Sequence, residues 1–224
     1  MKVAKQNVEL LDWCGDDLSV VNAARVSFAK QSSWVDTDTI CMELPEKDEK
    51  LIKYLAKHKH KSPFNHCFMS FRVKAPIFVA RQLVKHEYLP WNEVSRRYVS
   101  DEPEFFFPLG WAGKPINTKQ GSDGLVVDQW TQQEIAQMTT QYSLDAYTTL
   151  LHNGVAPEQA RMVLPQNTMT EWIWSGTLFA FAKMCKLRLD PHTQKETQEI
   201  AKMIDAEAKT LYPVSWEALM EYGE

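Results

Sequence analysis

Residues 85–98 combine most of the side-chain types that can hold a small anionic ligand. They read Lys-His-Glu-Tyr-Leu-Pro-Trp-Asn-Glu-Val-Ser-Arg-Arg-Tyr, so that an amide (Asn92) and a carboxylate (Glu93) precede the guanidinium groups of Arg96 and Arg97. Guanidinium groups bind phosphate or carboxylate through paired hydrogen bonds. Because so many polar groups are costly to bury, the segment is predicted to be either a ligand site held by a scaffold or a charged loop paired by internal salt bridges.

Two more arginines, Arg161 and Arg188, stand beside predicted helix ends and have apolar neighbours that would shield them from water. A nucleoside monophosphate needs such an arrangement, since a few guanidinium groups hold the phosphate while amides and a carboxylate contact the ring. We therefore expect Arg97, Arg161 and Arg188 to converge on one nucleotide-like anion.

Composition narrows the classes of protein that this chain represents. Its 224 residues are 44% hydrophobic, which is enough for a sizeable core. The net charge of -4 argues against nucleic-acid binding, and the short basic run at 57–61 lacks interleaved aromatic residues for base stacking. No apolar run approaches the roughly 18 residues that a membrane helix needs, and the N-terminus has no apolar signal core.

The four cysteines, Cys14, Cys41, Cys67 and Cys185, are scattered and form no Cys-x-x-Cys pair. This spacing predicts reduced thiols in a cytoplasmic protein and no zinc site. The histidines near residue 60 have no carboxylate or cysteine at ligand spacing, so no metal is expected. No cysteine has neighbours that would lower its pKa, so we do not expect a cysteine nucleophile.

Apolar periodicity predicts one α+β domain over residues 1–224, without repeats or an internal linker. Gly154 should end a helix, Gly176 should end a strand, and Asp190 should cap the last helix. The longest helix carries an apolar stripe made of Ile135, Met138, Tyr142, Ala146 and Leu150. The predicted strands are 3–12, 67–74 and 167–174, and the segments 36–49, 110–124 and 187–190 are connections. The predicted helices are 18–28, 46–58, 77–86, 128–151, 178–185 and 191–211, with a further short helix that Pro157 opens and that carries Arg161.

On these residues the chain resembles the flavin-dependent thymidylate synthases (the ThyX family), whose signature is Arg-His-Arg, seven residues and then Ser. Here Lys85-His86-Glu87 is followed by seven residues and Ser95, with Asn92-Glu93 before the Ser and Arg97-Tyr98 after it. The resemblance covers nearly the whole chain, because family-like segments follow in family order at 23–28, 60–64, 73–82, 160–165 and 187–192.

The resemblance implies a mostly antiparallel sheet flanked by long helices. It implies transfer of a one-carbon unit from methylenetetrahydrofolate to C5 of dUMP, with FAD relaying hydride from NADPH to give dTMP. It also implies a homotetramer whose active sites are shared between subunits.

The resemblance also implies roles for individual residues. A guanidinium at Arg188 would favour ionisation of the uracil ring and make C5 a better nucleophile, and Ser95 is the second implied catalytic residue. Arg188 also belongs to the implied substrate-binding set, with Gln82, Lys85, Glu93, Ser95, Arg96, Arg97 and Arg161. The implied flavin-binding residues are Ser27, Ser62, Lys85, His86, Glu87, Asn92, Thr177, Lys183 and His192.

The departures from the family pattern all fall on the flavin side. Lys85 and Glu87 replace the two signature arginines, and Asn65, Thr177 and Lys183 stand where the family has Glu, Asn and Asn. Lys85 keeps its charge but loses the planar fork. Either Glu87 and Lys183 have exchanged charge across the site, or flavin binding is altered, weakened or lost.

Two alternatives therefore stay open. If water rather than hydride followed the transferred carbon, the product would be a 5-hydroxymethyl pyrimidine nucleotide. A non-catalytic nucleotide-binding homologue is the second alternative, although pure binding has no need for an arginine at position 188. The sequence leaves open whether the substrate is dUMP or dCMP.

Overall fold

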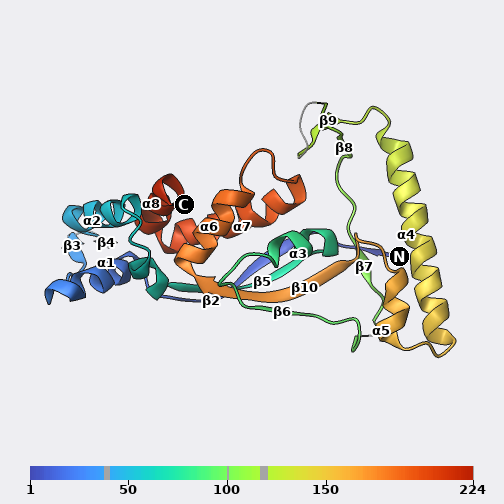
Figure 1. Cartoon of the computed structure of the whole chain (residues 1–224), viewed down its shortest axis with the longest axis horizontal. Coiled ribbons are helices and arrows are strands. Elements are labelled where there is room, and N and C mark those ends of the chain that lie inside the picture. The colour runs from blue at the N-terminus through green and yellow to red at the C-terminus, as the bar shows by residue number, and fades with distance from the viewer. Residues whose placement is uncertain (38–40, 100, 117–120, 224) are drawn as a thin grey trace.

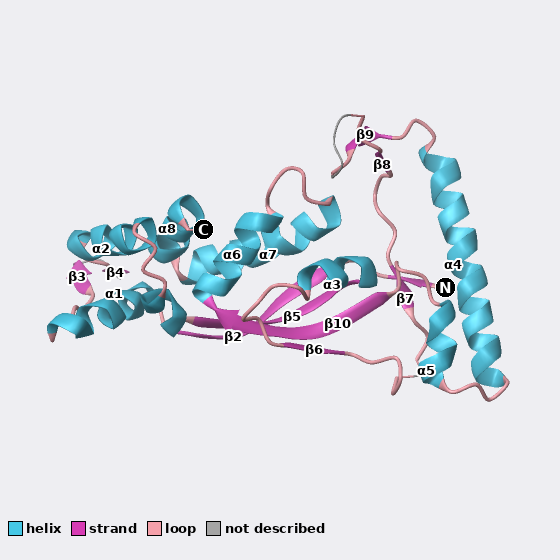
Figure 2. Cartoon of the chain, viewed as in Figure 1, coloured by secondary structure: helices cyan, strands magenta, loops and turns pink. Residues whose placement is uncertain are grey.

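The computed structural model describes residues 1–37, 41–99, 101–116 and 121–223 and confirms the predicted α+β class (Figures 1 and 2). A four-stranded antiparallel sheet lies in the middle, and helices pack on one of its faces. The helices are α1 (Asp17–Arg25), α2 (Glu46–Lys57), α3 (Ile77–Leu83), α4 (Gln129–His152), α5 (Pro157–Ala160), α6 (Leu178–Arg188), α7 (Lys195–Leu211) and α8 (Pro213–Tyr222), with 3-10 turns η1 (Val26–Phe28), η2 (Ser62–His66) and η3 (Arg161–Val163).

The central sheet has the strand order β2-β5-β10-β6, and each pairing in it is antiparallel. β5 and β10 pair along their whole length, from Pro76 opposite Met169 to Phe68 opposite Thr177. The strands are β1 (Lys2–Val3), β2 (Asn7–Cys14), β3 (Val35–Thr37), β4 (Cys41–Glu43), β5 (Phe68–Pro76), β6 (Trp91–Glu93), β7 (Glu104–Phe105), β8 (Ala112–Gly113), β9 (Asp123–Leu125) and β10 (Met169–Thr177).

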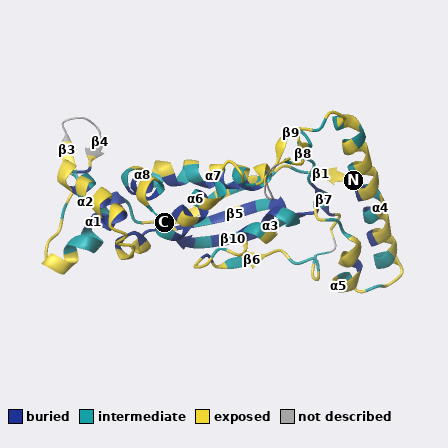
Figure 3. Cartoon of the chain, turned by 45° about the horizontal axis from the view of Figure 1, so that its top comes forward, coloured by how far each residue is buried: buried dark blue, intermediate teal, exposed yellow. Residues whose placement is uncertain are grey.

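Alternation along β5 and β10 sends apolar side chains to the face that the helices cover. Phe71 lies opposite Trp174 and Val73 lies opposite Trp172, and all four side chains are buried. The ring of Phe181 on α6 meets Phe71 and Trp174 edge-on, with centroids 5.2 and 5.4 Å away. This aromatic layer joins α6 to the two central strands, and Figure 3 colours much of β5 and β10 as buried.

The long helix α4 stands beside one end of the sheet, at the opposite end of the molecule from α1, α2 and α8 (Figure 1). It buries Thr140, Leu144 and Tyr147. The apolar stripe predicted for it is not covered within the chain, because Ile135 and Tyr142 are 55% and 77% exposed. Within the described residues, no helix is long and apolar enough to cross a membrane.

The predicted boundaries around residues 187–194 were wrong. Helix α6 continues to Arg188, so this arginine sits on the last turn of a helix and not in a loop. Asp190 does not cap the next helix, because its carboxylate accepts the backbone N–H of His192 (2.8 Å) and α7 begins only at Lys195. Asp side chains commonly bond the backbone two residues on, and that local turn delays the helix.

Gly176 does not end the third predicted strand, since β10 runs through it to Thr177. A Cβ at this position would clash with the side chain of Leu89, which is buried on the strand. That contact anchors the turn of residues 84–90. Helix α3 ends before this turn, at Leu83 and not at His86 as predicted. The predicted connections also hold short strands, since the segment 36–49 contributes to β3 and contains β4, and the segment 110–124 contains β8.

Helix α8 was not predicted, and a buried carboxylate from the other end of the chain caps it. The Asp17 side chain accepts the backbone N–H groups of Val214 (3.0 Å) and Ser215 (2.8 Å). Asp17 is only 2% exposed, and this burial raises the pKa of its carboxyl group. The two bonds join α1 to α8, so that residues nearly two hundred positions apart form one packed unit.

We expect Asp17→Ala to lower the free energy of unfolding by about 2 kcal/mol, because two buried N–H groups would lose their acceptor. Asp17→Asn keeps one acceptor oxygen and should fall between Ala and the wild type. Urea unfolding followed by circular dichroism measures all three proteins. An Ala variant as stable as the wild type would contradict this account of the cap.

Candidate active site

One group of predicted substrate residues lies at the outer edge of the sheet, around β6. Glu93, Arg96 and Arg161 line a cavity of about 280 Å³, together with Lys74 and Thr170. Glu93 comes from β6, Thr170 from the neighbouring β10, and Arg161 from η3. The sheet register and the short turn at residue 161 thus bring together groups that are far apart in the sequence.

The arginines of this group are held by neighbouring oxygen atoms. Arg96 donates to the backbone carbonyl of Asp101, and Arg161 Nε donates to the carbonyl of Glu158 (3.2 Å). Arg97 Nε donates to the hydroxyl of Ser95 (3.2 Å), while its guanidinium lies 4.9 Å from the ring centre of Tyr98. Each guanidinium keeps further N–H donors for a ligand, since it carries five.

A second group of predicted residues surrounds Arg188 on the helix side of the sheet. Arg188 Nε donates to His86 Nε2 (2.9 Å), and its terminal nitrogen donates to the carbonyl oxygen of Gln82 (2.9 Å). Gln82, Arg188, Asp190 and His192 line a cavity of about 500 Å³. Arg188 therefore has a fixed direction before any ligand arrives.

The imidazole of His86 acts as the acceptor in this pair. Burial, reinforced by the charges of Arg188 and Lys183, lowers the pKa of His86 to about 4. The ring is therefore neutral near pH 7 and accepts at Nε2, which leaves the proton on Nδ1. Burial also lowers the pKa of Arg188, but a guanidinium stays charged throughout the range in which proteins work.

Gln82 and His192 are also held in place. The Gln82 amide donates to Gln194 Oε1 (2.6 Å) and accepts from the hydroxyl of the buried Thr197 (3.2 Å). His192 Nδ1 lies 3.0 Å from the Asp190 carboxylate. Hydrogen bonds from the backbone N–H and side chain of His192 lower the pKa of Asp190. The Asp190 contact orients the His192 ring and leaves Nε2 without a partner among the described residues.

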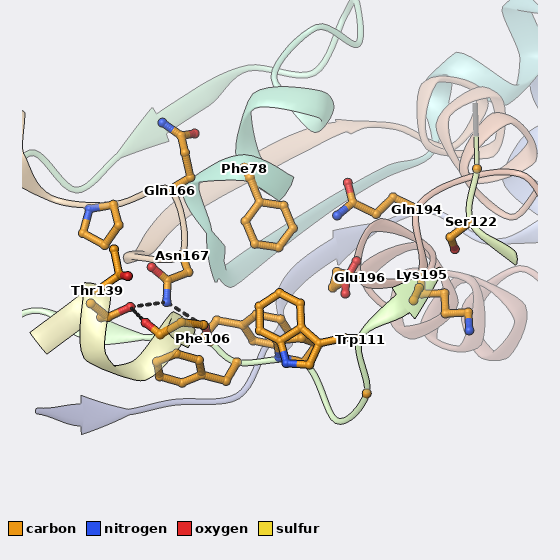
Figure 4. A pocket seen from close by; sticks show the side chains of 18 residues that line it. Phe78, Phe106, Trp111, Ser122, Thr139, Gln166, Asn167, Gln194, Lys195 and Glu196 are labelled. Carbon is orange, nitrogen blue, oxygen red and sulfur yellow. Dashed lines mark hydrogen bonds between the residues drawn. The ribbon is translucent and has the colours of Figure 1, made fainter. Parts of the chain in front are cut away.

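A third cavity, of about 710 Å³, adjoins the Arg188 group, since Gly121 and Gln194 line both spaces. Figure 4 shows its aromatic wall, formed by Phe78, Phe106 and Trp111. Hydrogen bonds hold this wall: Gln133 Oε1 accepts from the Trp111 indole N–H (3.1 Å), and Asn167 donates to the carbonyl of Phe106 (3.0 Å). The cavity has the volume of a typical small-molecule site, and these hydrogen bonds hold its aromatic wall in place.

The expected convergence of arginines does not occur within one chain. Arg96 and Arg161 line the cavity at β6, whereas Arg188 lines a different cavity that shares no lining residue with it. Arg97 lines neither cavity and is exposed. The two groups belong to different elements, because Glu93 is on the edge strand β6, whereas Arg188 is at the end of α6, which packs on the face of the sheet.

The predicted flavin residues come from several elements and turns of the chain. Ser27 on η1 and Ser62 on η2 are exposed, as are Lys85 and Asn92. Thr177 caps α6, because its hydroxyl accepts from the N–H of Ala180 (3.2 Å), and it donates to Asn65 (2.8 Å). Two of the departures from the family pattern, at 65 and 177, are therefore bonded to each other.

The predicted exchange of charge between Glu87 and Lys183 is not made by a contact between these two side chains within the described residues. Both side chains are exposed, and no ion pair joins them in the part of the chain that the structure describes. Lys183 instead lies near enough to His86 to help lower its pKa. Glu87 lies in the turn beside Tyr88, whose φ of 61° is left-handed.

Sequence reasoning missed several residues that hold the site together. Trp91 and Thr170 donate to the two carboxylate oxygens of Glu93, and Thr197 and Gln194 bond the amide of Gln82. These residues carry no motif of their own. Only the alternation of Thr170 with Trp172 along a strand signalled that both share a face.

Arg96, Arg161 and Arg188 give two cavities of this fold guanidinium groups of the kind that bind small anions. Residues 9–214 match the family described as thymidylate synthase complementing protein. Its relatives include flavin-dependent thymidylate synthases from Thermus thermophilus, 38% identical over 96% of this chain and 76% of that protein, and from Thermosipho africanus, 36% identical over 96% and 91%. The chain therefore belongs to the flavin-dependent thymidylate synthase family, as the sequence resemblance predicted.

A solved structure supports the same assignment. The UMP/dUMP methylase PolB from Streptomyces cacaoi, bound with 5-Br dUMP, superposes with a TM-score of 0.86 at 30% identity and covers 100% of this chain and 98% of that one. The same enzyme bound with 5-Br UMP gives a TM-score of 0.84. The antiparallel sheet with flanking helices is thus the fold of this methyltransferase family.

We expect the His86 ring to titrate with a midpoint near pH 4, which NMR of the imidazole C–H groups measures, with His86→Gln identifying the signals. Arg188→Gln should raise this midpoint, because a nearby positive charge would be gone. Because the folded-state pKa of His86 lies below the unfolded value of about 6.5, the unfolded chain takes up the proton first. The contribution of His86 therefore lowers the free energy of unfolding as pH falls from about 6.5 to 4. A midpoint near 6.5 would contradict the Arg188–His86 pairing.

Proposed function

We propose that this protein transfers a one-carbon unit from methylenetetrahydrofolate to C5 of dUMP and, with FAD and NADPH, gives dTMP. The observation that carries the proposal is Arg188, a guanidinium held by His86 and Gln82 at the edge of a cavity. A site that only bound a nucleotide would not need a fixed cation apart from its phosphate-binding arginines. We further propose that residues 1–224 act as one domain.

The residues divide into a phosphate side and a ring side. Arg96, Arg97 and Arg161 hold the phosphate through charge-assisted hydrogen bonds, and Ser95 and Lys85 supply further donors. Glu93 accepts from donors of the sugar or the base. Gln82, whose amide is fixed by Thr197 and Gln194, contacts the pyrimidine.

Arg188 supplies the electrostatic part of catalysis. A guanidinium beside the uracil ring stabilises negative charge that develops on it, which makes C5 electron-rich and able to attack the one-carbon unit. No enzyme nucleophile is required. Burial raises the pKa of Cys67 to about 12 and also raises that of Cys185, so neither thiol supplies a thiolate near pH 7.

The chain's polar groups fit a flavin only in part. Ser27, Ser62 and His192 offer exposed polar groups, and Lys183 offers a cation close to His86. Thr177 fits less well, since its hydroxyl is already bonded to Asn65 and Ala180. When bound, the flavin supplies the reducing equivalents that turn the transferred carbon into a methyl group. The aromatic cavity beside Arg188 offers room for a second planar reactant.

We also propose that the active unit is a homotetramer with shared sites. Two observations support it: the arginines divide between two separate cavities, and the apolar stripe of α4 is exposed in the single chain. A second copy that covered α4 would bury Ile135, Met138 and Tyr142 and contribute its own arginine group. Burial of such side chains is favourable by about 25 cal/mol per Å² of apolar surface.

UMP is a second candidate substrate, because the structural neighbour PolB is described as a UMP/dUMP methylase. The two nucleotides differ by one hydroxyl on the sugar. A site that hydrogen-bonds that hydroxyl discriminates strongly against the nucleotide that lacks it. Substrate preference therefore depends on which protein group meets the 2′ position.

Purified protein with FAD, NADPH, methylenetetrahydrofolate and dUMP should consume NADPH and yield a methylated nucleotide by mass spectrometry. Arg188→Gln should lower kcat by about a hundredfold or more, because transition-state charge loses its partner. Parallel runs with UMP and dCMP measure substrate choice. A product heavier by one oxygen would instead support hydroxymethyl transfer, and tight dUMP binding without any product would support a non-catalytic homologue.

Complementation tests the shared site. Arg161→Ala and Arg188→Ala should each be inactive alone, but co-expressed mixtures should regain activity, because some sites would then combine both intact arginines from different copies. Arg161→Ala with Arg96→Ala is the matched control, since both residues line one cavity and no mixed site is restored. If the first mixture stayed inactive although size-exclusion chromatography showed mixed tetramers, the shared site would be wrong.

A further inference from the structure

The carboxylate of Glu93 is bonded at both of its oxygen atoms. Trp91 donates its indole N–H to Oε2 (3.1 Å), and Thr170 donates its hydroxyl to Oε1 (2.6 Å). Glu93 on β6 pairs with Trp172 on β10, so Thr170 is its diagonal neighbour on the same face of the sheet. Trp91 lies two residues before Glu93 and shares that face.

Packing fixes the donor ring of Trp91. It stacks on Trp172 with ring centres 4.1 Å apart and planes at 18°, and it meets Trp174 edge-on at 5.7 Å. Trp172 and Trp174 are buried, and their indole N–H groups have no partner within the described residues. The three rings thus form one cluster, and Trp91 is the member whose N–H bonds a predicted ligand-binding group.

This arrangement decides where the negative charge of Glu93 points. Glu93 lines the same cavity as Arg96 and Arg161, yet neither guanidinium forms an ion pair with it in the described parts of the chain. A free glutamate on an edge strand has mobile side-chain torsions. It would turn toward a neighbouring guanidinium and occupy the donors that a phosphate needs.

We propose that Trp91 and Thr170 are positioning residues that hold the Glu93 carboxylate away from Arg96 and Arg161 and toward the nucleotide. This inference rests on the proposed function only in taking a nucleoside monophosphate as the ligand of that cavity. The pair keeps two opposite charges separate inside one small space. It also lowers the side-chain entropy that binding would otherwise cost.

The test measures dUMP affinity by isothermal titration calorimetry, together with KM and kcat, in the full-length protein. Trp91→Phe keeps an aromatic ring but removes the N–H, and Thr170→Val keeps the shape but removes the hydroxyl. Each should raise Kd and KM for dUMP about tenfold, because a bond to a charged group is lost. The kcat of either variant should change much less, since neither residue contacts the reacting atoms.

Trp172→Phe is the matched control. It makes the same exchange in the same cluster but removes an N–H that has no partner, so it should lower Tm at least as much as Trp91→Phe while leaving Kd nearly unchanged. In a Glu93→Gln background, Trp91→Phe should add little further loss of affinity. If Trp91→Phe fails to fold, Thr170→Val carries the same comparison.

The outcomes separate the two proposals. If the wild type binds dUMP and both Trp91→Phe and Thr170→Val match Trp172→Phe in Kd, the positioning role is wrong while the proposed function stands. If the wild type binds no dUMP, the proposed function is overturned and this inference with it. A selective tenfold rise in Kd that disappears in the Glu93→Gln background supports the assignment.

Discussion

The antiparallel pairing of β5 with β10 is the constraint on which the arrangement of the site depends. α3 follows β5 directly and α6 follows β10 directly, so the two helices start at opposite ends of the paired strands. Both lie on the same face of the sheet (Figure 1). Their C-terminal ends therefore meet, and Arg188 at the end of α6 donates to the carbonyl of Gln82 near the end of α3.

The same pairing also positions the group of residues around β6. β10 is the strand that carries Thr170 and Trp172 to the edge where β6 adds Trp91 and Glu93. A slip of one residue would turn all of these side chains to the other face. Buried Trp172 and Trp174 oppose such a slip, because their burial requires the observed register.

The arginines of the two groups differ in the partners that hold them. Arg188 lies against a histidine that burial keeps neutral, so the pair carries a single positive charge, which the proposed function uses beside the pyrimidine ring. Arg96 and Arg161 are held by backbone carbonyls at the edge of the sheet and keep donors for an anion. A single copy of the chain keeps these two groups in separate cavities, and the proposed tetramer would use the exposed stripe of α4 to bring groups of different copies together.

The sequence by itself determined β5, α3, α4 and the α+β class, because local periodicity, Pro76 and Gly154 act over a few residues. It also identified the family, through the order of its polar segments. Only the tertiary structure decided that Arg188 bonds His86, that Asp17 caps α8, and that Trp91 and Thr170 hold Glu93. Three of these contacts join residues on different elements, so they depend on strand register and helix packing, and no spacing along the chain records them. The bond between Trp91 and Glu93 lies within β6, at a spacing of two residues, and only the structure shows that the two side chains meet.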